Sequence, residues 1–453
     1  LKSISSRERK NRVFNFNQTL EALYATDILK KKGFRVGDLI LSSKRLEEKE
    51  FRDNYKNKEK YISIFSSFYR ENYGSLPDGV IDWLRTKVNS IPLNNPTQLF
   101  ELWKEFLKKY KLKKYLGREM TISNPEVSQY VLSTTAQKSD DHGLITCVRK
   151  GKGDSIQVPS FLSKDGTLHC RVTGNKSEWA SVKNHRGEDL VFEKSWKFSP
   201  IGITGKSNSS ILHDDNNNAF LWLADTVWFG LTDRISNADW KALMHKRTEQ
   251  GFNVMQVVSG LLPEAAFGEP ATLLDGVTSW TLDKKELEKR WWDAADLRII
   301  DAVQAGQMPA LVGAWSYYIL EFGEERLKQH WSEMIARWSA FPVFWCVAGE
   351  VGLMEYKDLF ADDMQEKALS IQQMWKPVIS HVRNTDPWKR PITVHPCPAF
   401  NYSSTEALQG DENLDFIWLQ TGHADVNVIK ATLGALNKAQ RDSKLPVINS
   451  EVC

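Results

Sequence analysis

The second half of the sequence predicts a (β/α)₈ barrel, and two observations carry this prediction. From Ile201 onward, short apolar runs alternate with longer stretches of helical periodicity, which is the sequence pattern of consecutive βαβ units. The apolar runs also lead into polar or aromatic residues, as at the carboxyl ends of barrel strands. The runs that we expect to form strands are 220–224, 253–258, 309–313, 342–347, 392–394, 416–419 and 446–449.

Helical stretches separate these runs, for example 237–250, 291–305, 325–340 and 364–384. An open nucleotide-binding sheet would show the same alternation, but it usually has a glycine-rich turn after its first strand. Here the first run leads into Asp225, Thr226, Val227 and Trp228, with no glycine among them. The sequence therefore favours the barrel over the nucleotide-binding sheet.

The barrel is expected to be incomplete, because seven strands are visible and eight are needed. The chain begins at Leu1 rather than Met, and Cys453 follows the seventh run after only a few residues. We expect a fragment, with barrel residues 199–453 and an eighth strand falling beyond Cys453. The lack of a signal peptide is therefore not evidence about the protein's location, since that segment could precede Leu1.

Two other regions precede the barrel. Residues 1–125 are rich in Lys, Arg, Glu and Leu with helical spacing, which predicts a basic helical segment. Its charge suits solvated helix faces better than a patch for an anionic partner, because aromatic and basic residues are not interleaved. Residues 126–198 contain short apolar runs between turn residues and predict a small β region, part of an accessory sandwich.

Composition and charge do not predict nucleic acid, a membrane or a metal as a partner. The formal net charge of +3 over 453 residues gives no argument for nucleic acid or a membrane surface, and no apolar run is long enough to cross a membrane. The five cysteines (Cys147, Cys170, Cys346, Cys397 and Cys453) lack the short paired spacing of zinc or redox motifs. We expect no metal and no cofactor. The 17 Trp residues could fill a core or stack on a planar ligand, and for any single Trp the core is favoured.

Two glutamates follow expected strands that lie across the barrel mouth from one another. Glu350 follows the fourth strand and Glu451 the seventh. Glycoside hydrolysis needs two such carboxyl groups flanking the scissile bond, one protonated and one ionised. The apolar run 343–347 implies a partly dry surrounding that favours the protonated form at Glu350. We therefore expect Glu350 to be the acid/base and Glu451 the nucleophile or general base on a carbohydrate substrate.

Other strand ends supply groups that suit sugar binding. Hydroxyl contacts are expected from carboxylate, amide and imidazole groups, and ring stacking from tryptophans, although each could instead close the barrel mouth or fill the core. Asp225 could also be a third carboxylate or replace either glutamate. The two histidines lack close metal-ligand spacing. The candidate substrate-binding residues are Asp225, Trp228, Gln256, Trp315, His395, Gln420 and His423.

These strand ends resemble the apiosidase-like glycoside hydrolase family, over about residues 200–453 and in the family's order. The similarity does not extend to residues 1–195. The matching strings are FLWLADTVW at 220–228, RTEQGFNVMQ at 247–256, RWWDAADLRIIDAVQAGQMPALVGAW at 290–315, PVFWCVAGE at 342–350, RPITVHP at 390–396, LDFIWLQTGH at 414–423 and PVINSEVC at 446–453.

The resemblance implies a barrel enzyme that acts on pectic polysaccharide of plant cell walls, with members that release apiose, and a secreted or periplasmic protein. It places the catalytic carboxylates at Glu350 and Glu451. Many members have Asp after a Gly-Gly pair where this chain has Ala348, Gly349 and Glu350. The alternative function is a non-catalytic carbohydrate-binding or scaffold protein that retains the barrel.

Overall fold

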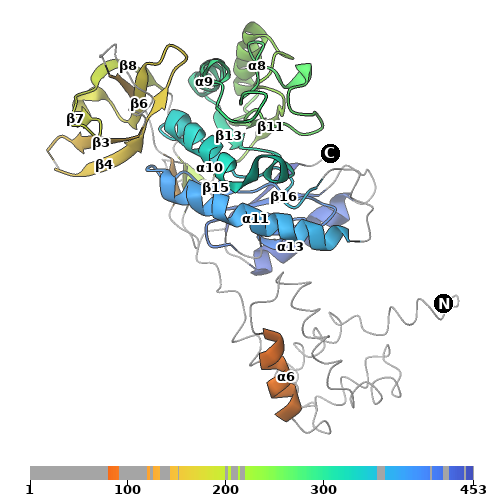
Figure 1. Ribbon diagram of the computed structural model, residues 1–453. Coiled ribbons are helices and arrows are strands. Elements are labelled where there is room, and N and C mark those ends of the chain that lie inside the picture. The colour runs from red at the N-terminus through yellow and green to blue at the C-terminus, as the bar shows by residue number, and fades with distance from the viewer. Residues whose placement is uncertain are drawn as a thin grey trace. The chain divides into compact units, whose positions relative to one another are not determined.

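The chain divides into two compact units, Leu1–Lys114 and Tyr115–Cys453. In the first unit the structure, a computed structural model, describes one helix, α6 (Val80–Ser90); the rest of the expected helical segment lies almost wholly outside the described residues, as does His423. The described residues are 80–90, 120–122, 126–132, 143–151, 153–198, 203–205, 213–214, 220–354, 363–408, 411–421, 428–442 and 445–451 (Figure 1).

Residues 126–197 form two antiparallel sheets that share one apolar core. The four-stranded sheet has the order β5-β6-β2-β8 and the three-stranded sheet the order β4-β3-β7. Cys147 and Cys170 are fully buried in the shared core. The strands are β2 (Glu126–Val131), β3 (Leu144–Arg149), β4 (Ser155–Pro159), β5 (Phe161–Leu162), β6 (Leu168–Thr173), β7 (Trp179–Lys183) and β8 (Val191–Lys197), with a turn of 3-10 helix at Lys176–Glu178.

A third, small sheet has the order β1-β9-β10, from β1 (Met120–Ile122), β9 (Ile203–Gly205) and β10 (His213–Asp214). Parallel strands follow it along the chain. The order β11-β12-β13-β14-β15 forms one parallel sheet, and β16 and β17 form a parallel pair. Their bounds are β11 (Ala224–Thr226), β12 (Val254–Val258), β13 (Met308–Val312), β14 (Phe344–Cys346), β15 (Ile392–Thr393), β16 (Ile417–Gln420) and β17 (Val447–Glu451).

A helix separates each parallel strand from the next, so the expected α/β architecture with parallel strands is confirmed (Figure 1). Hydrogen bonds also join β15 to the segment entering β16: Asp415 N donates to Ile392 O at 2.8 Å, and Thr393 Oγ1 donates to Phe416 O at 3.0 Å. The helices are α8 (Asn237–Glu249), α9 (Lys289–Gln304), α10 (Tyr318–Trp338), α11 (Met364–Thr385), α12 (Ser404–Ala407) and α13 (Val428–Asp442), with a 3-10 turn at Pro270–Thr272. In the described part of the chain, no helix is long and apolar enough to cross a membrane.

The first expected strand was placed too early, since β11 begins at Ala224. The side chain of Asn253 bonds the backbone of the preceding run: Leu223 N donates to Asn253 Oδ1 at 3.1 Å, and Asn253 Nδ2 donates to Leu221 O at 2.8 Å. Leu221 is 75% exposed, so this apolar run is not a buried strand. Helix α10 likewise begins before the expected range, with a break at Gly323, whose φ of 75° suits glycine.

Tryptophan fills the core of the α/β part, as the sequence favoured for single tryptophans. The indole N–H groups of several bond buried acceptors; Trp375 Nε1, for example, donates to Ser316 O at 3.1 Å. Large rings thus bury much apolar area, and the indole nitrogens of Trp291, Trp331 and Trp418 are buried without a hydrogen-bond partner. The fully buried tryptophans are Trp240, Trp280, Trp291, Trp292, Trp331, Trp338, Trp345, Trp375 and Trp418.

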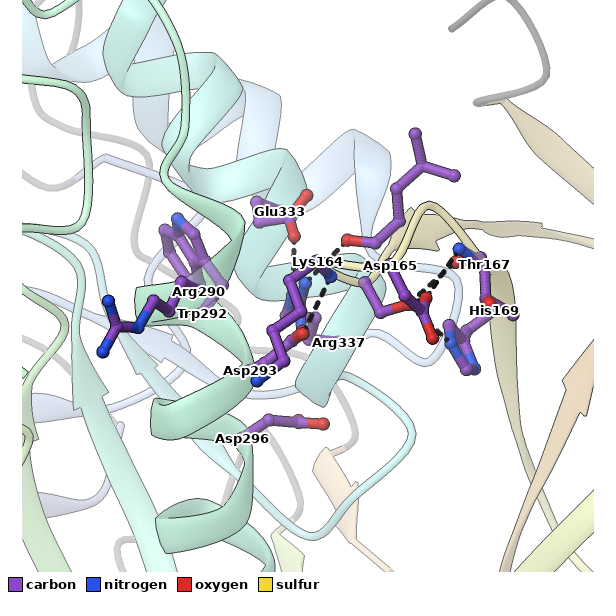
Figure 2. A network of polar contacts seen from close by, with 12 residues as sticks. Lys164, Asp165, Thr167, His169, Arg290, Trp292, Asp293, Asp296, Glu333 and Arg337 are labelled. Carbon is purple, nitrogen blue, oxygen red and sulfur yellow. Dashed lines mark hydrogen bonds and ion pairs between the residues drawn. The ribbon is translucent and has the colours of Figure 1, made fainter. Parts of the chain in front are cut away.

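Charged groups join the β region to helices α9 and α10, as Figure 2 shows around Arg337. The fully buried Arg337 donates to Glu333 Oε1 at 2.6 Å, to Asp293 Oδ1 at 2.9 Å and to Leu162 O at 3.0 Å. Asp293 also accepts from Lys164 N at 2.8 Å. Each charge is therefore paired and hydrogen-bonded, which a buried charge requires.

A second ion pair, Arg171 with Asp296, lies in the same interface. Both terminal nitrogens of Arg171, in β6, donate to the Asp296 carboxylate of α9, one of them at 2.6 Å. It also donates to Gln129 Oε1 at 2.7 Å and to Arg337 O at 2.7 Å, and it is 3% exposed. Planar guanidinium and carboxylate groups match in two parallel hydrogen bonds, so this contact fixes orientation as well as charge.

His330 makes stability depend on pH. It is fully buried in α10 and accepts from Trp280 Nε1 at 3.1 Å through Nδ1, and burial lowers its pKa from 6.5 to about 3. In the unfolded chain it protonates near pH 6.5, so the unfolded state gains a proton first and the free energy of unfolding falls as pH drops below 6.5. The variant His330→Gln is expected to lose stability on acidification more slowly, by about 1.4 kcal/mol per pH unit between pH 6.5 and 4.

Urea unfolding at several pH values measures this slope. The matched control is His245→Gln, which changes an exposed histidine in α8 and should leave the slope as it is. Equal slopes for His330→Gln and the parent protein would contradict the prediction.

Candidate active site

Five of the candidate site residues form one contact network at the carboxyl ends of the parallel strands. Glu451 is the last described residue of β17, Gln420 the last of β16, and His395 follows β15 by two residues. Glu350 and Trp315 lie in the loops after β14 and β13, in segments joined by the bridge between Trp315 and Gly349. The five-stranded parallel sheet and the β16–β17 pair therefore bring together side chains that lie up to 136 positions apart in the sequence.

The two glutamates share one hydrogen-bond donor, the side-chain nitrogen of Gln420. Its Nε2 donates to Glu350 Oε1 at 3.2 Å and to Glu451 Oε2 at 3.3 Å. These two carboxyl oxygens are therefore at most 6.5 Å apart, the sum of the two distances. The separation is about 5.6 Å if the two N–H bonds, about 120° apart, point straight at their acceptors.

An irregularity in the β16–β17 ladder aligns this pair. Leu419 is paired with Asn449, but the next pair is Gln420 with Glu451, so Ser450 is passed over. Because side chains alternate between the two faces of a strand, the extra residue turns the Glu451 side chain toward Gln420. Ser450 is itself fixed, since its Oγ donates to Leu419 O at 2.9 Å.

Gln256 holds the strand that carries Glu451. Its Nε2 donates to Ser450 O at 2.8 Å and to Thr226 Oγ1 at 2.8 Å, and it is 1% exposed. Gln256, which the sequence predicted to bind substrate, thus bonds the backbone next to Glu451, in a strand other than its own. Deletion of this amide would leave a buried carbonyl without its donor.

Glu350 is held by Trp315 on its other oxygen. Trp315 Nε1 donates to Glu350 Oε2 at 3.2 Å, and the indole is 3% exposed. A Cβ on Gly349 would lie 2.2 Å from the indole, so only glycine lets the ring lie against this backbone. Trp315 therefore orients the carboxyl group, and little of its ring remains for stacking on a sugar.

The backbone of Glu350 is strained. Its φ of 44° lies in the left-handed region, which is costly for a residue with a Cβ. Neighbouring hydrogen bonds hold it there: Val351 N donates to His395 O at 2.8 Å, and Leu353 N donates to Glu350 O at 2.8 Å. Such conformations persist where the surroundings impose them, and they cluster at functional sites.

His395 lies beside Glu451 and is fully buried. Its Nε2 is 3.2 Å from Glu451 Oε2, a close approach whose angle is not that of an aligned hydrogen bond, and its Nδ1 contacts Pro396 O at 3.1 Å. If the ring is neutral with its hydrogen on Nδ1, that N–H donates to Pro396 O, and the lone pair of Nε2 faces Glu451. The ring also packs edge-on against Trp228, at 5.7 Å between centroids.

Trp228 is half-buried and meets Trp315 edge-to-face at 5.5 Å. Its remaining exposed surface makes it a better candidate than Trp315 for contact with a sugar ring. Asp225 is bonded differently: its carboxylate accepts from Arg247 Nε of helix α8 at 2.5 Å. Its strand neighbour Thr226 lies on the opposite face with Gln256, so Asp225 is turned toward the helix.

Two residues near Glu350 were not identified from sequence, Tyr317 and Cys397. Burial is the largest cause that raises the pKa of Tyr317 to about 12 and that of Cys397 to about 12, and the charge of Glu350 contributes to both values. Both therefore stay protonated at neutral pH. Each follows a strand-end residue by two positions, Trp315 and His395 respectively, and this spacing is the signal that could have found them. Among the described residues, no cluster of three or more His, Cys, Asp or Glu is placed to hold a metal ion.

Comparison with known proteins assigns residues 206–453 to the family described as apiosidase-like, catalytic domain. No curated protein matches the chain. Among solved structures, a glycoside hydrolase family 5 protein from Bacteroides vulgatus is 17% identical, with a TM-score of 0.40, over 55% of this chain and 52% of that one. The match thus spans about half of that protein.

Two mannanases give similar values. The endo-1,4-β-D-mannanase of Thermotoga petrophila is 14% identical over 51% of this chain and 78% of its own, with a TM-score of 0.38. The endo-1,4-β-mannanase of Rhizomucor miehei is 12% identical over 52% and 78%, with a TM-score of 0.41. The family match covers more than half of the 453 residues and includes both glutamates. The chain therefore belongs to the apiosidase-like family, with its catalytic domain at residues 206–453.

Proposed function

We propose that the protein is a glycoside hydrolase that cleaves glycosidic bonds in pectic polysaccharide of plant cell walls, with Glu350 and Glu451 as its two catalytic carboxylates. The observation that carries this proposal is the contact of one nitrogen, Gln420 Nε2, with both carboxyl groups. It brings two carboxylates from different strands to opposite sides of one donor. Two carboxyl groups at close range are what glycoside hydrolysis requires.

The separation favours retention of configuration. Retaining enzymes place the carboxyl groups about 5–5.5 Å apart, and inverting enzymes leave roughly 6.5–9.5 Å for a water molecule. The limit of 6.5 Å between the two bonded oxygens leaves little room for that water. We therefore propose a two-step reaction through a covalent glycosyl-enzyme.

In the first step, the Glu451 carboxylate attacks the anomeric carbon while Glu350 gives its proton to the departing glycosidic oxygen. In the second, Glu350 takes a proton from water, and the water oxygen displaces Glu451 from the same carbon. Two carboxylates this close do not ionise independently, because charge on one disfavours charge on the other. We assign the proton that is transferred to Glu350, whose carboxyl group Trp315 and Gln420 hold in place.

Substrate binding is proposed for the groups around this pair. Trp228 offers partly exposed ring surface, and His395 lies beside Glu451. Asp225, Trp315, Gln256, Gln420 and His423 remain candidates from the sequence. We further propose that the parallel strands belong to a closed (β/α)₈ barrel, supported by the bond from Gln256 of β12 to Ser450 of β17. A secreted or periplasmic location would give access to a wall polysaccharide.

Product stereochemistry tests the proposal. Pectic oligosaccharides that carry apiose are incubated with the protein, and the anomer formed first is followed by ¹H NMR before it mutarotates. Sugar release with retained configuration is expected. Release of the inverted anomer would overturn the two-step reaction, and saturable sugar binding without any release would favour the non-catalytic carbohydrate-binding protein.

A further inference from the structure

We infer that Gln420 is a positioning residue that holds both catalytic carboxylates through a single amide nitrogen and so keeps their spacing and their protonation matched to catalysis. This inference rests on the proposed function. It gives Gln420 a role that acts through the two glutamates, whereas the sequence pointed only to contact with a sugar hydroxyl.

The donor geometry is specific. A side-chain amide nitrogen carries two hydrogens, so each carboxylate can receive its own N–H. The reverse orientation would place Oε1 against two carboxyl oxygens, with acceptors facing acceptors, so the orientation with Nε2 toward the glutamates is the favourable one. A hydroxyl, with one hydrogen, could serve only one carboxylate at a time.

The amide has little freedom to leave this position. Gln420 is 2% exposed, and its backbone nitrogen donates to Tyr402 O at 3.1 Å. Because Ser450 is left out of the β16–β17 pairing, Glu451 lies directly beside Gln420 in the adjacent strand. One residue thereby links the ends of β16 and β17 to the loop after β14.

Removal of the amide should change ionisation of the pair. N–H donation favours the ionised form of a carboxyl group, so loss of the donor makes both groups harder to ionise. The ionisable groups that face the pair include His395 beside Glu451, and Tyr317 and Cys397 beside Glu350. A substitution at Gln420 leaves these in place, so the change can be assigned to the lost N–H groups.

The test compares Gln420→Met with the parent enzyme. We expect kcat to fall about 100-fold or more, KM to change less than threefold, and both limbs of the kcat/KM profile to move up by about one pH unit. A rise in KM alone, or an unchanged pH profile of kcat/KM, would overturn the inference and indicate that Gln420 binds substrate.

The matched control is Gln307→Met, which removes an equally buried amide that donates to Thr248 Oγ1 and Phe252 O, both at 2.7 Å. The control should lower the melting temperature without moving either limb.

A second variant covers the case in which Gln420→Met does not fold. Gln420→Glu keeps the size of the side chain but offers one hydrogen when protonated and none when ionised. As the pH rises from 5 to 7, the activity of Gln420→Glu is expected to fall by a factor at least ten times larger than the factor for the parent. Equal pH dependence of the two proteins would overturn the inference. Full activity of Glu350→Gln and Glu451→Gln would instead overturn the proposed function. If those two variants are inactive while Gln420→Met and Gln420→Glu behave as the parent, only the role of Gln420 is wrong.

Discussion

Replacing Glu451 with glutamine is expected to lower kcat/KM on pectic oligosaccharides by about 10,000-fold or more, because the amide cannot attack the anomeric carbon. A factor of that size corresponds to roughly 5.5 kcal/mol of lost transition-state stabilisation. The fold should be retained, since glutamine fills the same volume and can still meet Gln420 through its oxygen. Steady-state kinetics and a thermal melt of the purified variant measure the two effects separately.

Glu350→Gln separates the roles of the two carboxylates. Its loss is expected to be about 100- to 10,000-fold on natural linkages, and much smaller on an aryl glycoside whose leaving group needs no proton. Glu451→Gln should stay inactive on both substrates. The control is Glu321→Gln, which changes an exposed glutamate bonded to Lys284 and should leave kcat/KM unaltered. Wild-type rates for both site variants would disprove the assignment.

Arg171→Met is expected to lower the free energy of unfolding by about 3–5 kcal/mol, because it leaves a buried carboxylate without its main counter-charge. Burial by itself raises the pKa of Asp296, but Arg171 and Arg337 outweigh it and hold that pKa below its usual value. In the variant, burial gains influence and Asp296 should bind a proton more readily. The loss of stability is therefore expected to be larger at pH 7 than at pH 5.

Chemical denaturation of the parent and variant at both pH values measures this effect. The matched control is Arg290→Met, which breaks the surface pair with Asp275, where both side chains are about half exposed. That change should cost less than about 1 kcal/mol. Similar losses for the two arginine variants would show that Arg171 is not a buried counter-charge of the kind described.

Most of the parallel strands could be predicted from the sequence because their apolar runs are short and bounded by turn residues. The run 220–223 was wrongly predicted to be part of a strand. Its backbone is hydrogen-bonded by the Asn253 side chain, and no local sequence pattern indicates that contact. Asp225 has the residue type and position of a site carboxylate, yet its partner Arg247 lies on a helix 22 positions away. Local periodicity cannot reveal which of two faces such a residue takes.

Strand ends alone pointed to Glu350, Gln420 and Glu451, but not to their common nitrogen. That contact depends on the irregular pairing at Ser450, which arises from how two strands meet and leaves no composition signal. The support from Trp315 was likewise hidden, because it needs both a ring after β13 and a residue without a Cβ at Gly349. The sequence therefore predicted the candidate carboxylates, and only tertiary packing shows which side chains orient them.

The left-handed backbone at Glu350 has a consequence for engineering. A residue with a Cβ in this conformation costs roughly 1–2 kcal/mol, whereas glycine adopts it without that penalty. A search for thermostable variants would therefore tend to remove the side chain that the proposed reaction needs, and would enrich proteins that are stable but, on that proposal, inactive. Improved variants of this enzyme should be sought with position 350 held as glutamate, and with stability added at sites that do not contact the carboxylate pair.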